Sequence, residues 1–381
     1  MHLRQLIDRP IASASPMAQG AAPRHSTLED AGHRAREASD LGLGRAQFRR
    51  AARWVLANLV LLLAIAVAAA ALLDAPTWKS LDTALHSSGI AAAATATIIA
   101  MSLNVARWLV LWRTELGRGP IAVQALFYVS GYAMSATPGR AGELIRLWFN
   151  RRHFGVSYLR SLPVFVLDRV ADTTSVVVCG VVGFAIINQS FEVLLPFGIF
   201  STIALCVLGF PRPWLALIRG LRVRLSGRFR MGAGLLRVAA LTLARTARLY
   251  RRPAFMPALL LAIASRVVQC IGLSLVLASA EQDVSLALAL TAYSAGSLAG
   301  AASFLPAGLG AAELAIIATL AAYGLPAAPV VASVIVFRVG GFWLATLIGL
   351  AALSTALALV RLRKDTSISP CLPLREINVA S

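Results

Sequence analysis

The sequence predicts an all-α polytopic membrane helical bundle that contains two inverted repeats. Three observations predict this class: 58% of the 381 residues are hydrophobic, only 14% are charged, and the mean hydropathy is +0.74. A soluble domain of this length needs many more charges on its surface. Most of the long apolar runs approach the roughly 20 residues that cross a bilayer as a helix, and the sequence lacks the short alternating segments of a transmembrane barrel.

The two ends of the chain differ in composition from its middle. Residues 1–50 carry mixed charge and three prolines and have no apolar core near Met1. This predicts a disordered cytoplasmic N-terminal extension rather than a signal peptide. Residues 51–362 form the predicted transmembrane domain, and residues 363–381 form a predicted cytoplasmic tail.

Positive charge predicts how the first spans are oriented. Four arginines lie between residues 45 and 53, just before the apolar run 54–73. Cytoplasmic ends are enriched in arginine, so the first span is expected to run outward and the second, about 89–112, to return. Near the end of this second span, Trp108 and Trp112 are interpreted as an interface belt, with Arg107 extending towards the cytoplasm.

The apolar run 119–139 is flanked by arginines on both sides, so both of its ends are expected to be cytoplasmic. A re-entrant hairpin satisfies this condition. Residues 120–137 enter, the chain turns at Pro138 and Gly139, and residues 141–153 leave on the same side. Non-helical backbone at such a turn is tolerated only where protein or water surrounds it.

The next spans are expected over 161–188, running outward, and 191–210, running back. The loop that follows, 211–253, contains eleven arginines and no acidic residue, which makes it the strongest cytoplasmic marker in the chain. Its segment 234–250 spaces arginines among Leu and Ala and favours a helix lying on an anionic leaflet. The alternative, that these arginines only set the topology, is equally open.

The last part of the chain predicts a second hairpin of opposite orientation. Residues 254–280 run outward, residues 284–304 and 311–323 form a hairpin that turns near Pro306, and residues 328–360 return to the cytoplasm. We therefore expect six full spans plus two re-entrant hairpins, or eight spans by hydropathy. The repeat units cover about 120–210 and 284–360, and both termini are expected in the cytoplasm.

A repeated motif supports internal duplication. The stretch from Ser135 to Glu143 resembles the stretch from Ser303 to Glu313. Arg169 follows Glu143 by 26 residues, and Arg338 follows Glu313 by 25. Duplicated halves interrupted by Gly and Pro indicate a transporter with a midplane site, although chance similarity among Ala-rich helices is an alternative. The predicted hairpin turns are Pro138, Gly139, Gly142, Pro306, Gly308 and Gly310.

Ionisable residues near these turns are the candidates for substrate binding or coupling. Each costs about 2.5–3.5 kcal/mol in hydrocarbon unless it is paired or hydrated. Guanidinium groups suit a phosphate, while a carboxylate can balance charge or carry a coupling proton. The candidates are Arg140, Glu143, Arg146, Asp168, Arg169, Asp172, Glu313 and Arg338.

A structural role for the same residues is the competing interpretation. Salt bridges from Glu143 to Arg169 and from Glu313 to Arg338 would pin each hairpin against its span. Arg266, halfway along its span, either faces the same cavity or marks a shorter helix. Ser135 and Ser303 are expected to cap backbone groups freed at the turns.

Several function classes are disfavoured by composition. The formal charge of +19 comes from arginines beside apolar runs, and no basic segment interleaved with aromatics is present, so no nucleic acid partner is expected. The five histidines fall in tails, loops or near an interface, and the four cysteines lack metal-ligand spacing. We therefore predict no catalytic residue, no metal and no cofactor.

The motifs together resemble a known family. The segments 137–146, 168–172 and 306–313 are similar to the lysylphosphatidylglycerol synthase transmembrane region, whose members are also described as flippase-like. The similarity covers about residues 50–362. It implies a multi-pass protein of the bacterial inner (plasma) membrane, with lipid translocation as its activity. Asp168 stands where the family pattern has Glu.

The resemblance also bears on enzyme activity. Family members that make aminoacylated lipids carry a large soluble transferase domain after the membrane part. Only about 20 residues follow the last predicted span, so synthase activity is not expected. The leading hypothesis is flipping of an anionic or amphipathic membrane lipid. The alternative is a non-catalytic scaffold that docks a cytoplasmic lipid or glycan biosynthetic enzyme through residues 211–253.

Overall fold

A computed structural model describes residues 78–79, 81–82, 88–117, 119–135, 137, 142–188, 210–226 and 230–365, and every regular element in these ranges is a helix. All of them lie in the unit formed by residues 55–381. The expected first span, nearly all of the expected return span 191–210, the predicted N-terminal extension, and all of the predicted C-terminal tail except residues 363–365 lie outside the described residues. Residues 363–365 continue the last helix instead of beginning a separate tail.

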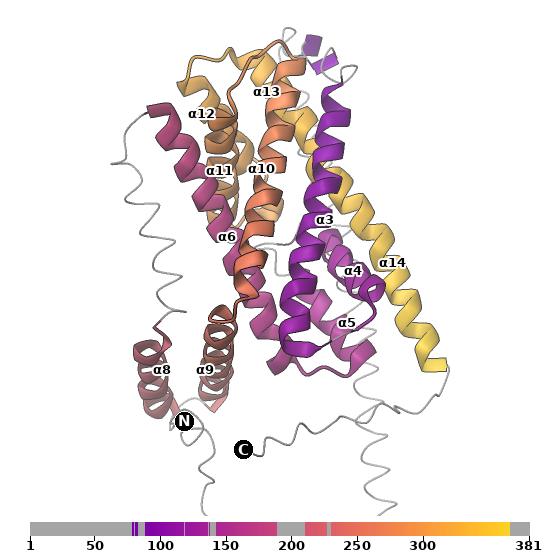
Figure 1. Ribbon diagram of the computed structural model, residues 1–381, viewed down its shortest axis with the longest axis vertical. Helices are drawn as coiled ribbons and strands as arrows, with labels where there is room; N and C mark the ends of the chain where they lie inside the picture. Colours follow the sequence, from indigo (N-terminus) through magenta and orange to yellow (C-terminus); the bar gives the residue numbers. More distant parts are fainter. Residues whose placement is uncertain are drawn as a thin grey trace, which may run out of the picture. The chain divides into compact units, whose positions relative to one another are not determined.

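Within the described ranges, four helical stretches are long and apolar enough to cross a membrane. The fourth, residues 327–360, is continuous but contains a π-helical turn, η4 (Val339–Trp343), directly after Arg338. Such turns often occur at functional sites. The long stretches are α3 (Gly89–Leu116), α6 (Tyr158–Asn188), α10 (Phe255–Ser279), and α13 (Ala327–Arg338) continued by η4 and α14 (Leu344–Asp365) (Figure 1).

The outer faces of the long helices carry exposed apolar side chains. Contiguous surface of this kind is unfavourable in water and fits contact with lipid chains. Many polar residues of the same helices are buried inside the bundle, among them Asn104, Arg107 and Asp168. The exposed side chains on these faces include Ile98, Ile99, Val178, Val182, Ile186, Leu260, Ile271, Leu275 and Leu347.

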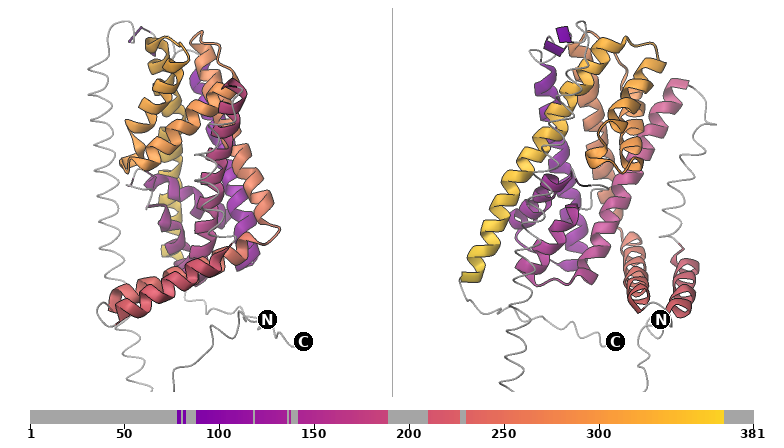
Figure 2. Two further views of the ribbon diagram at one scale, coloured as in Figure 1. Left: turned by 90° about the vertical axis from the view of Figure 1, so that its left-hand side faces the viewer. Right: turned by 180° about the vertical axis from the view of Figure 1, so that it is seen from behind.

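Two pairs of shorter helices occur where the sequence predicts its hairpins. The first pair lies beside the lower half of α3 in Figure 1, and the second lies beside the upper half of α6 (Figures 1 and 2). Each helix is shorter than the roughly 20 residues of a full span. The first pair is α4 (Ile121–Ser130) with the 3-10 turn η1 (Gly131–Met134), then α5 (Ile145–Phe154); the second is α11 (Leu286–Ala302), the 3-10 turn η3 (Pro306–Gly308) and α12 (Ala311–Ala322).

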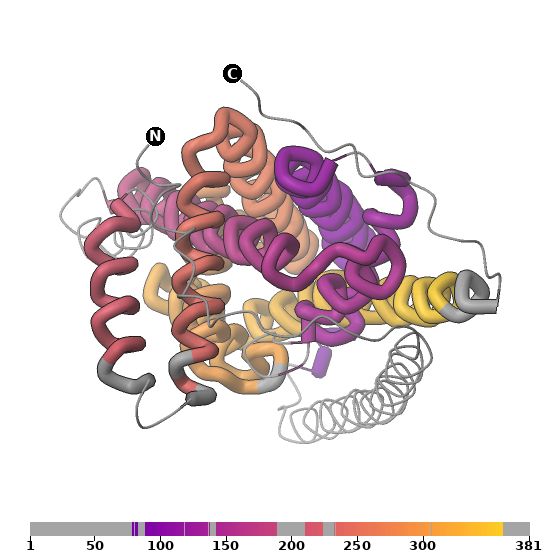
Figure 3. The backbone as a smooth tube through the Cα atoms, turned by 90° about the horizontal axis from the view of Figure 1, so that it is seen from below, coloured from indigo at the N-terminus to yellow at the C-terminus, as the bar shows by residue number. Residues whose placement is uncertain are grey.

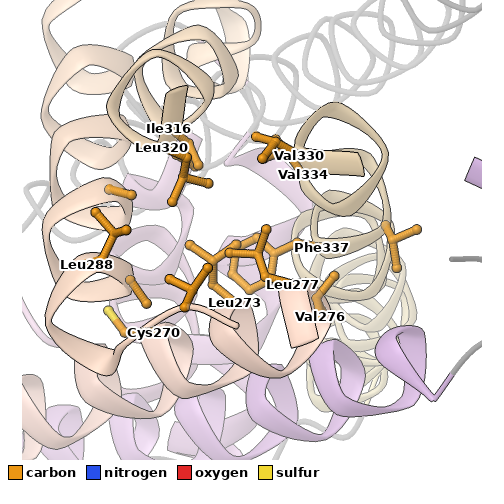
Figure 4. Close-up of a cluster of buried hydrophobic side chains, with 14 of the residues drawn as sticks. Cys270, Leu273, Val276, Leu277, Leu288, Ile316, Leu320, Val330, Val334 and Phe337 are labelled. Atoms are coloured by element: carbon orange, nitrogen blue, oxygen red, sulfur yellow. The ribbon is translucent and has the colours of Figure 1, made fainter. Parts of the chain in front are cut away.

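Apolar packing joins each hairpin to the long helices. Around the second hairpin, Leu273, Leu277, Leu288, Leu320 and Phe337 bring α10, α11, α12 and α13 together (Figure 4). These side chains interdigitate across four helices that are distant in the sequence. The second hairpin is therefore held mainly by apolar contacts.

The core around the first hairpin corrects one expectation. Trp108 and Trp112 do not form an interface belt, because both side chains are buried among apolar residues. The ring centroids of Trp108 and Tyr128 lie 5.7 Å apart, so α3 packs on α4 through these aromatics. Each large aromatic ring buries about 150–250 Å² and dominates the energetics of packing, which accounts for the position of these tryptophans inside the bundle.

Two amphipathic helices follow the long helix α6 in the chain. They are α8 (Pro211–Ser226) and α9 (Arg230–Tyr250), and the predicted helix 234–250 is confirmed within α9. Both lie crosswise to the long helices, at the end where α5 finishes and α6 begins (Figure 2, left). Seen from below, they run side by side (Figure 3).

Candidate functional site

The first hairpin is closed by side chains that satisfy freed backbone groups. Ser135 Oγ donates to the carbonyl of Tyr132 over 2.8 Å, and Thr137 Oγ1 donates to the carbonyl of Met134 over 2.8 Å. Thr137 Oγ1 in turn accepts from the N–H of Gly142 over 2.7 Å. The capping role expected for Ser135 is confirmed. The predicted turn residues Pro138 and Gly139 and the candidate Arg140 are outside the described residues.

The second hairpin turns through left-handed backbone. Gly308 and Gly310 have φ of 66° and 81°, a region that favours glycine. Gly308 also lies against the backbone of Gly300, where a Cβ would come within 2.7 Å of the neighbouring Cα. Ser303 Oγ donates to the carbonyl of Gly300 over 2.9 Å and accepts from the N–H of Leu305 over 3.2 Å, so its expected capping role is confirmed too. Pro306 begins the short turn η3.

Asp168 is the centre of a buried charge cluster. Arg107 Nε donates to Asp168 Oδ1 over 2.7 Å, and Arg169 Nη2 donates to Oδ2 over 2.7 Å. Nη1 of Arg146 lies 3.6 Å from the same Oδ2. The Asp168 side chain is fully buried. Three guanidinium groups from α3, α5 and α6 thus surround one carboxylate.

Glu143 links the first hairpin to α6. Its Oε2 accepts from Arg146 Nη2 over 2.7 Å and lies 3.1 Å from Arg169 Nη1. The Glu143 to Arg169 salt bridge considered from the sequence is therefore present. The same arginine also contacts Asp168, so this bridge is one part of a network rather than an isolated pair.

Asp172 extends the cluster towards α10. Arg266 Nη2 donates to Asp172 Oδ1 over 2.5 Å, and Arg107 Nη1 donates to the same oxygen over 3.1 Å. The question left open for Arg266 is thereby answered, because its guanidinium group lies in the cluster and also donates to the hydroxyl of Tyr293 over 3.1 Å.

Arg146 is held by aromatic rings as well as by carboxylates. Its guanidinium carbon lies 4.2 Å from the ring centroid of Tyr128 and 5.5 Å from those of Trp108 and Phe165. Only 1% of the Arg146 side chain is exposed. Desolvated cation–π contacts of this kind help to offset the cost of burying the charge.

Among the described residues, the second hairpin carries a single ion pair. Arg338 Nε lies 2.5 Å from Glu313 Oε1, as the alternative salt bridge predicts, and each side chain is 20% exposed. Glu313 Oε2 and Arg338 Nη2 are buried and have no hydrogen-bond partner among the described residues. The two halves therefore differ, since a seven-residue network supports the first hairpin and one partly exposed pair supports the second.

A cavity of about 350 Å³ lies between the two hairpins. The first hairpin contributes Ser135, Thr137 and Glu143 to its wall, and the second contributes Gly300 and Gly308. Four arginines from four different long helical stretches also line it: Arg107, Arg169, Arg266 and Arg338. The structure thus brings residues that flank the first predicted turn and residues of the second turn to one space.

The charge balance of the site is positive. In the first-hairpin cluster, four arginines face three carboxylates, and the Arg338 to Glu313 pair adds one charge of each sign. Several buried polar atoms that belong to cavity residues have no hydrogen-bond partner within the described part of the chain. They are Nε of Arg169, Nε of Arg266, Nη2 of Arg338, Thr97 Oγ1 and Asn104 Oδ1. Such unpaired groups in a polar cavity suit a polar or anionic ligand.

Sequence reasoning misplaced Arg107. It was expected to extend to the cytoplasmic interface, but its side chain is 1% exposed and paired with two aspartates. Asn104 lies three residues earlier, on the same face of α3, and its Nδ2 donates to Tyr132 Oη over 3.4 Å. Two polar residues on the same face of an otherwise apolar helix indicate that this face is directed into the bundle, and this signal was available in the sequence.

The comparison with known families agrees with this architecture. A family model described as the lysylphosphatidylglycerol synthase TM region matches residues 54–349. The chain belongs to this family. No curated protein matches the chain. As a lysylphosphatidylglycerol synthase TM region protein it is an integral membrane protein of a family associated with lipid handling, and the match includes both hairpins and the cavity.

Membership in the lysylphosphatidylglycerol synthase TM family does not by itself assign a role to the charge cluster. The geometry shows what the cluster can do: it offers guanidinium donors, held by salt bridges, to a small polar group in the cavity. Within the ranges that the structure describes, no three His, Cys, Asp or Glu side chains are grouped to hold a metal ion.

Proposed function

We propose that this protein moves a lipid with an anionic head group between the two leaflets of a membrane. The observation that carries this proposal is the cavity between the hairpins, which is lined by four arginines and has an excess of positive charge. A volume of about 350 Å³ is at the small end of ligand pockets and suits a head group rather than whole acyl chains. The acyl chains would stay in lipid beside the apolar outer faces.

The ion pairs made by the cavity arginines favour transient binding of a lipid head group. Guanidinium groups bind phosphate through paired N–H donors, and Arg338 has such a donor unpaired in the cavity. Two carboxylates that also line the cavity, Glu143 and Asp172, offset half of the charge of its four arginines. A transport site must bind well enough to admit its substrate and weakly enough to release it, so partial neutralisation supports passage rather than trapping.

The orientation is part of the proposal. The C-terminal ends of α5 and α14 lie at the same end of the bundle as the crosswise helices α8 and α9 (Figure 1). We assign this arginine-rich end to the cytoplasmic side of a bacterial inner membrane. The two hairpins would then enter from opposite sides as re-entrant elements of inverted repeats. Alternating access around a fixed midplane site is the behaviour that such a plan supports.

Reconstitution tests the proposal directly. Purified protein would be placed in vesicles that contain a trace of fluorescent phosphatidylglycerol or fluorescent phosphatidylcholine, and an impermeant reductant would bleach label in the outer leaflet. We expect the protein to move labelled lipid from the inner to the outer leaflet, where the reductant bleaches it. The rate of bleaching should be higher for phosphatidylglycerol than for phosphatidylcholine. Heat-denatured protein is the control. A phosphatidylglycerol rate equal to that of protein-free vesicles would refute the proposal, and equal acceleration of both lipids would refute the preference for an anionic head group.

A further inference from the structure

The crosswise helix α8 has two chemically different faces. The apolar residues Trp214, Leu217 and Leu221 are spaced three and four apart, which places them on one face of the helix. Their side chains are 42%, 63% and 45% exposed. The basic residues lie on another face and are also exposed: Arg212, Arg219 and Arg222. Exposed large apolar side chains next to a basic row are typical of a helix that lies in a membrane interface.

The neighbouring helix α9 holds α8 in place. The C-terminal half of α9 is fixed to α6, because Arg245 Nη1 donates to the carbonyl of Leu159 over 2.8 Å and Ala247 is buried. Its N-terminal half is less buried, with Leu235 68% exposed. Leu215 of α8 is buried, and α8 packs along α9. The pair is therefore a fixed structural unit with an uncovered apolar surface.

We propose that α8 and α9 form a pair of interfacial helices that binds the surface of an anionic leaflet. Two features favour lipid over a protein partner. Both helices lie crosswise to the four long helical stretches, which is the direction of a membrane plane if those stretches cross the bilayer (Figure 2). The segment 211–253 carries eleven arginines and no acidic residue, a charge that complements anionic lipid head groups. This inference does not depend on whether the cavity transports lipid.

Site-directed labelling separates the faces of α8. An environment-sensitive fluorophore would be attached at Leu221→Cys, on the apolar face, or at Ala216→Cys, an exposed position on another face of the same helix. The full chain, with its native cysteines replaced, would be placed in nanodiscs that contain brominated lipid. In nanodiscs with 30% phosphatidylglycerol, we expect quenching at position 221 to be at least threefold that at position 216.

Charge and lipid composition provide the discriminating controls. Replacing Arg212, Arg219 and Arg222 by Gln, or using phosphatidylcholine alone, should reduce quenching at position 221 to the level at position 216. Strong quenching in every lipid would overturn the anionic specificity. Equal, weak quenching at both positions would overturn membrane binding and would favour a surface that docks a cytoplasmic protein.

A second measurement uses the chain without substitutions. Trypsin cleavage after Arg219 and Arg222 would be followed by mass spectrometry in neutral and in anionic nanodiscs. Anionic lipid should slow cleavage at these sites about tenfold relative to cleavage after Arg152, which is exposed at the end of α5. Equal protection in both lipids would contradict the proposal even if lipid flipping is observed.

Discussion

Arg107 and Asp168, which lie 61 residues apart in the chain, form a 2.7 Å hydrogen-bonded ion pair in which both side chains are almost completely buried. This contact joins α3 to α6 at the level of the cavity. Asp168 also forms an ion pair with Arg169 and lies near Arg146, so that one carboxylate partly neutralises three guanidinium groups. Its loss would leave buried positive charges without compensation.

Asp168→Asn is expected to destabilise the protein strongly. Removing one partner of a buried ion pair costs about 3–5 kcal/mol, because the other charge stays desolvated. Thermal unfolding in detergent, followed by circular dichroism, measures the effect as a lower Tm. Glu115→Gln is the matched control, since Glu115 lies 4.0 Å from a half-exposed Arg252 and its loss should cost less than about 1 kcal/mol. Equal Tm shifts for the two variants would contradict the central role of Asp168.

Arg338→Gln is expected to impair lipid movement while leaving the fold intact. Arg338 is the cavity arginine with an unpaired Nη2, and a hydrogen bond to a charged group contributes about 1.5–3 kcal/mol. The vesicle assay should therefore show a loss of about tenfold or more in the phosphatidylglycerol rate.

The control for that experiment is Arg152→Gln, which removes an exposed arginine at the end of α5. It should retain the full rate, and both variants should keep a Tm within a few degrees of the unsubstituted protein. An unchanged rate for Arg338→Gln would remove this residue from the proposed pathway.

Gly142→Ala is expected to destabilise the first hairpin. An added Cβ would lie 2.5 Å from the Met134 Cβ and 2.7 Å from the Met134 carbonyl oxygen, closer than atoms pack, so backbone must move. Overpacking of this kind costs about 1–3 kcal/mol, measured as a lower Tm. Gly220→Ala in α8 is the matched substitution, because no atom lies within 4 Å of its added Cβ and alanine favours a helix. A Tm that falls equally in both variants would argue against the tight turn.

The opposed hairpins predict labelling from different sides of the membrane. Arg152 lies in the last turn of α5, at the end of the first hairpin that we assign to the cytoplasm, and Ala327 lies just after the second hairpin. Both positions are exposed, and each would be replaced by cysteine. Each variant would be expressed in cells from a chain whose other cysteines have been replaced. In intact cells, an impermeant maleimide should label position 327, whereas it should label position 152 only after the cells are permeabilised. Labelling of both positions from one side would exclude inverted repeats.

The sequence located the elements well because their signals are local. Apolar length predicted α3, α6 and α10 within a few residues, and the Gly and Pro breaks predicted both short helix pairs. The Glu313 to Arg338 pair was found for the same reason, since a repeated motif and spacing marked both residues. Their assignment to lipid transport stays a prediction.

The partners of the buried charges could not be found in this way. Arg107 was placed at the interface because it lies among tryptophans near the end of an apolar run, where side chains often extend to water. In the structure that face of α3 is directed towards α6, and the guanidinium group of Arg107 forms ion pairs with Asp168 and Asp172. Rotation of a helix about its axis depends on its neighbours, which composition does not specify.

By itself the sequence determined that this is a helical membrane protein with two broken apolar elements, because hydrophobic length and helix-breaking residues act within one segment. Only the tertiary structure decided that residues of both hairpins and four arginines line one cavity. It also decided that a seven-residue charge network supports the first hairpin whereas one ion pair among the described residues supports the second. The physical reason is that an ion pair in a bundle depends on the distance between helices, and that distance is set by packing among segments far apart in the chain.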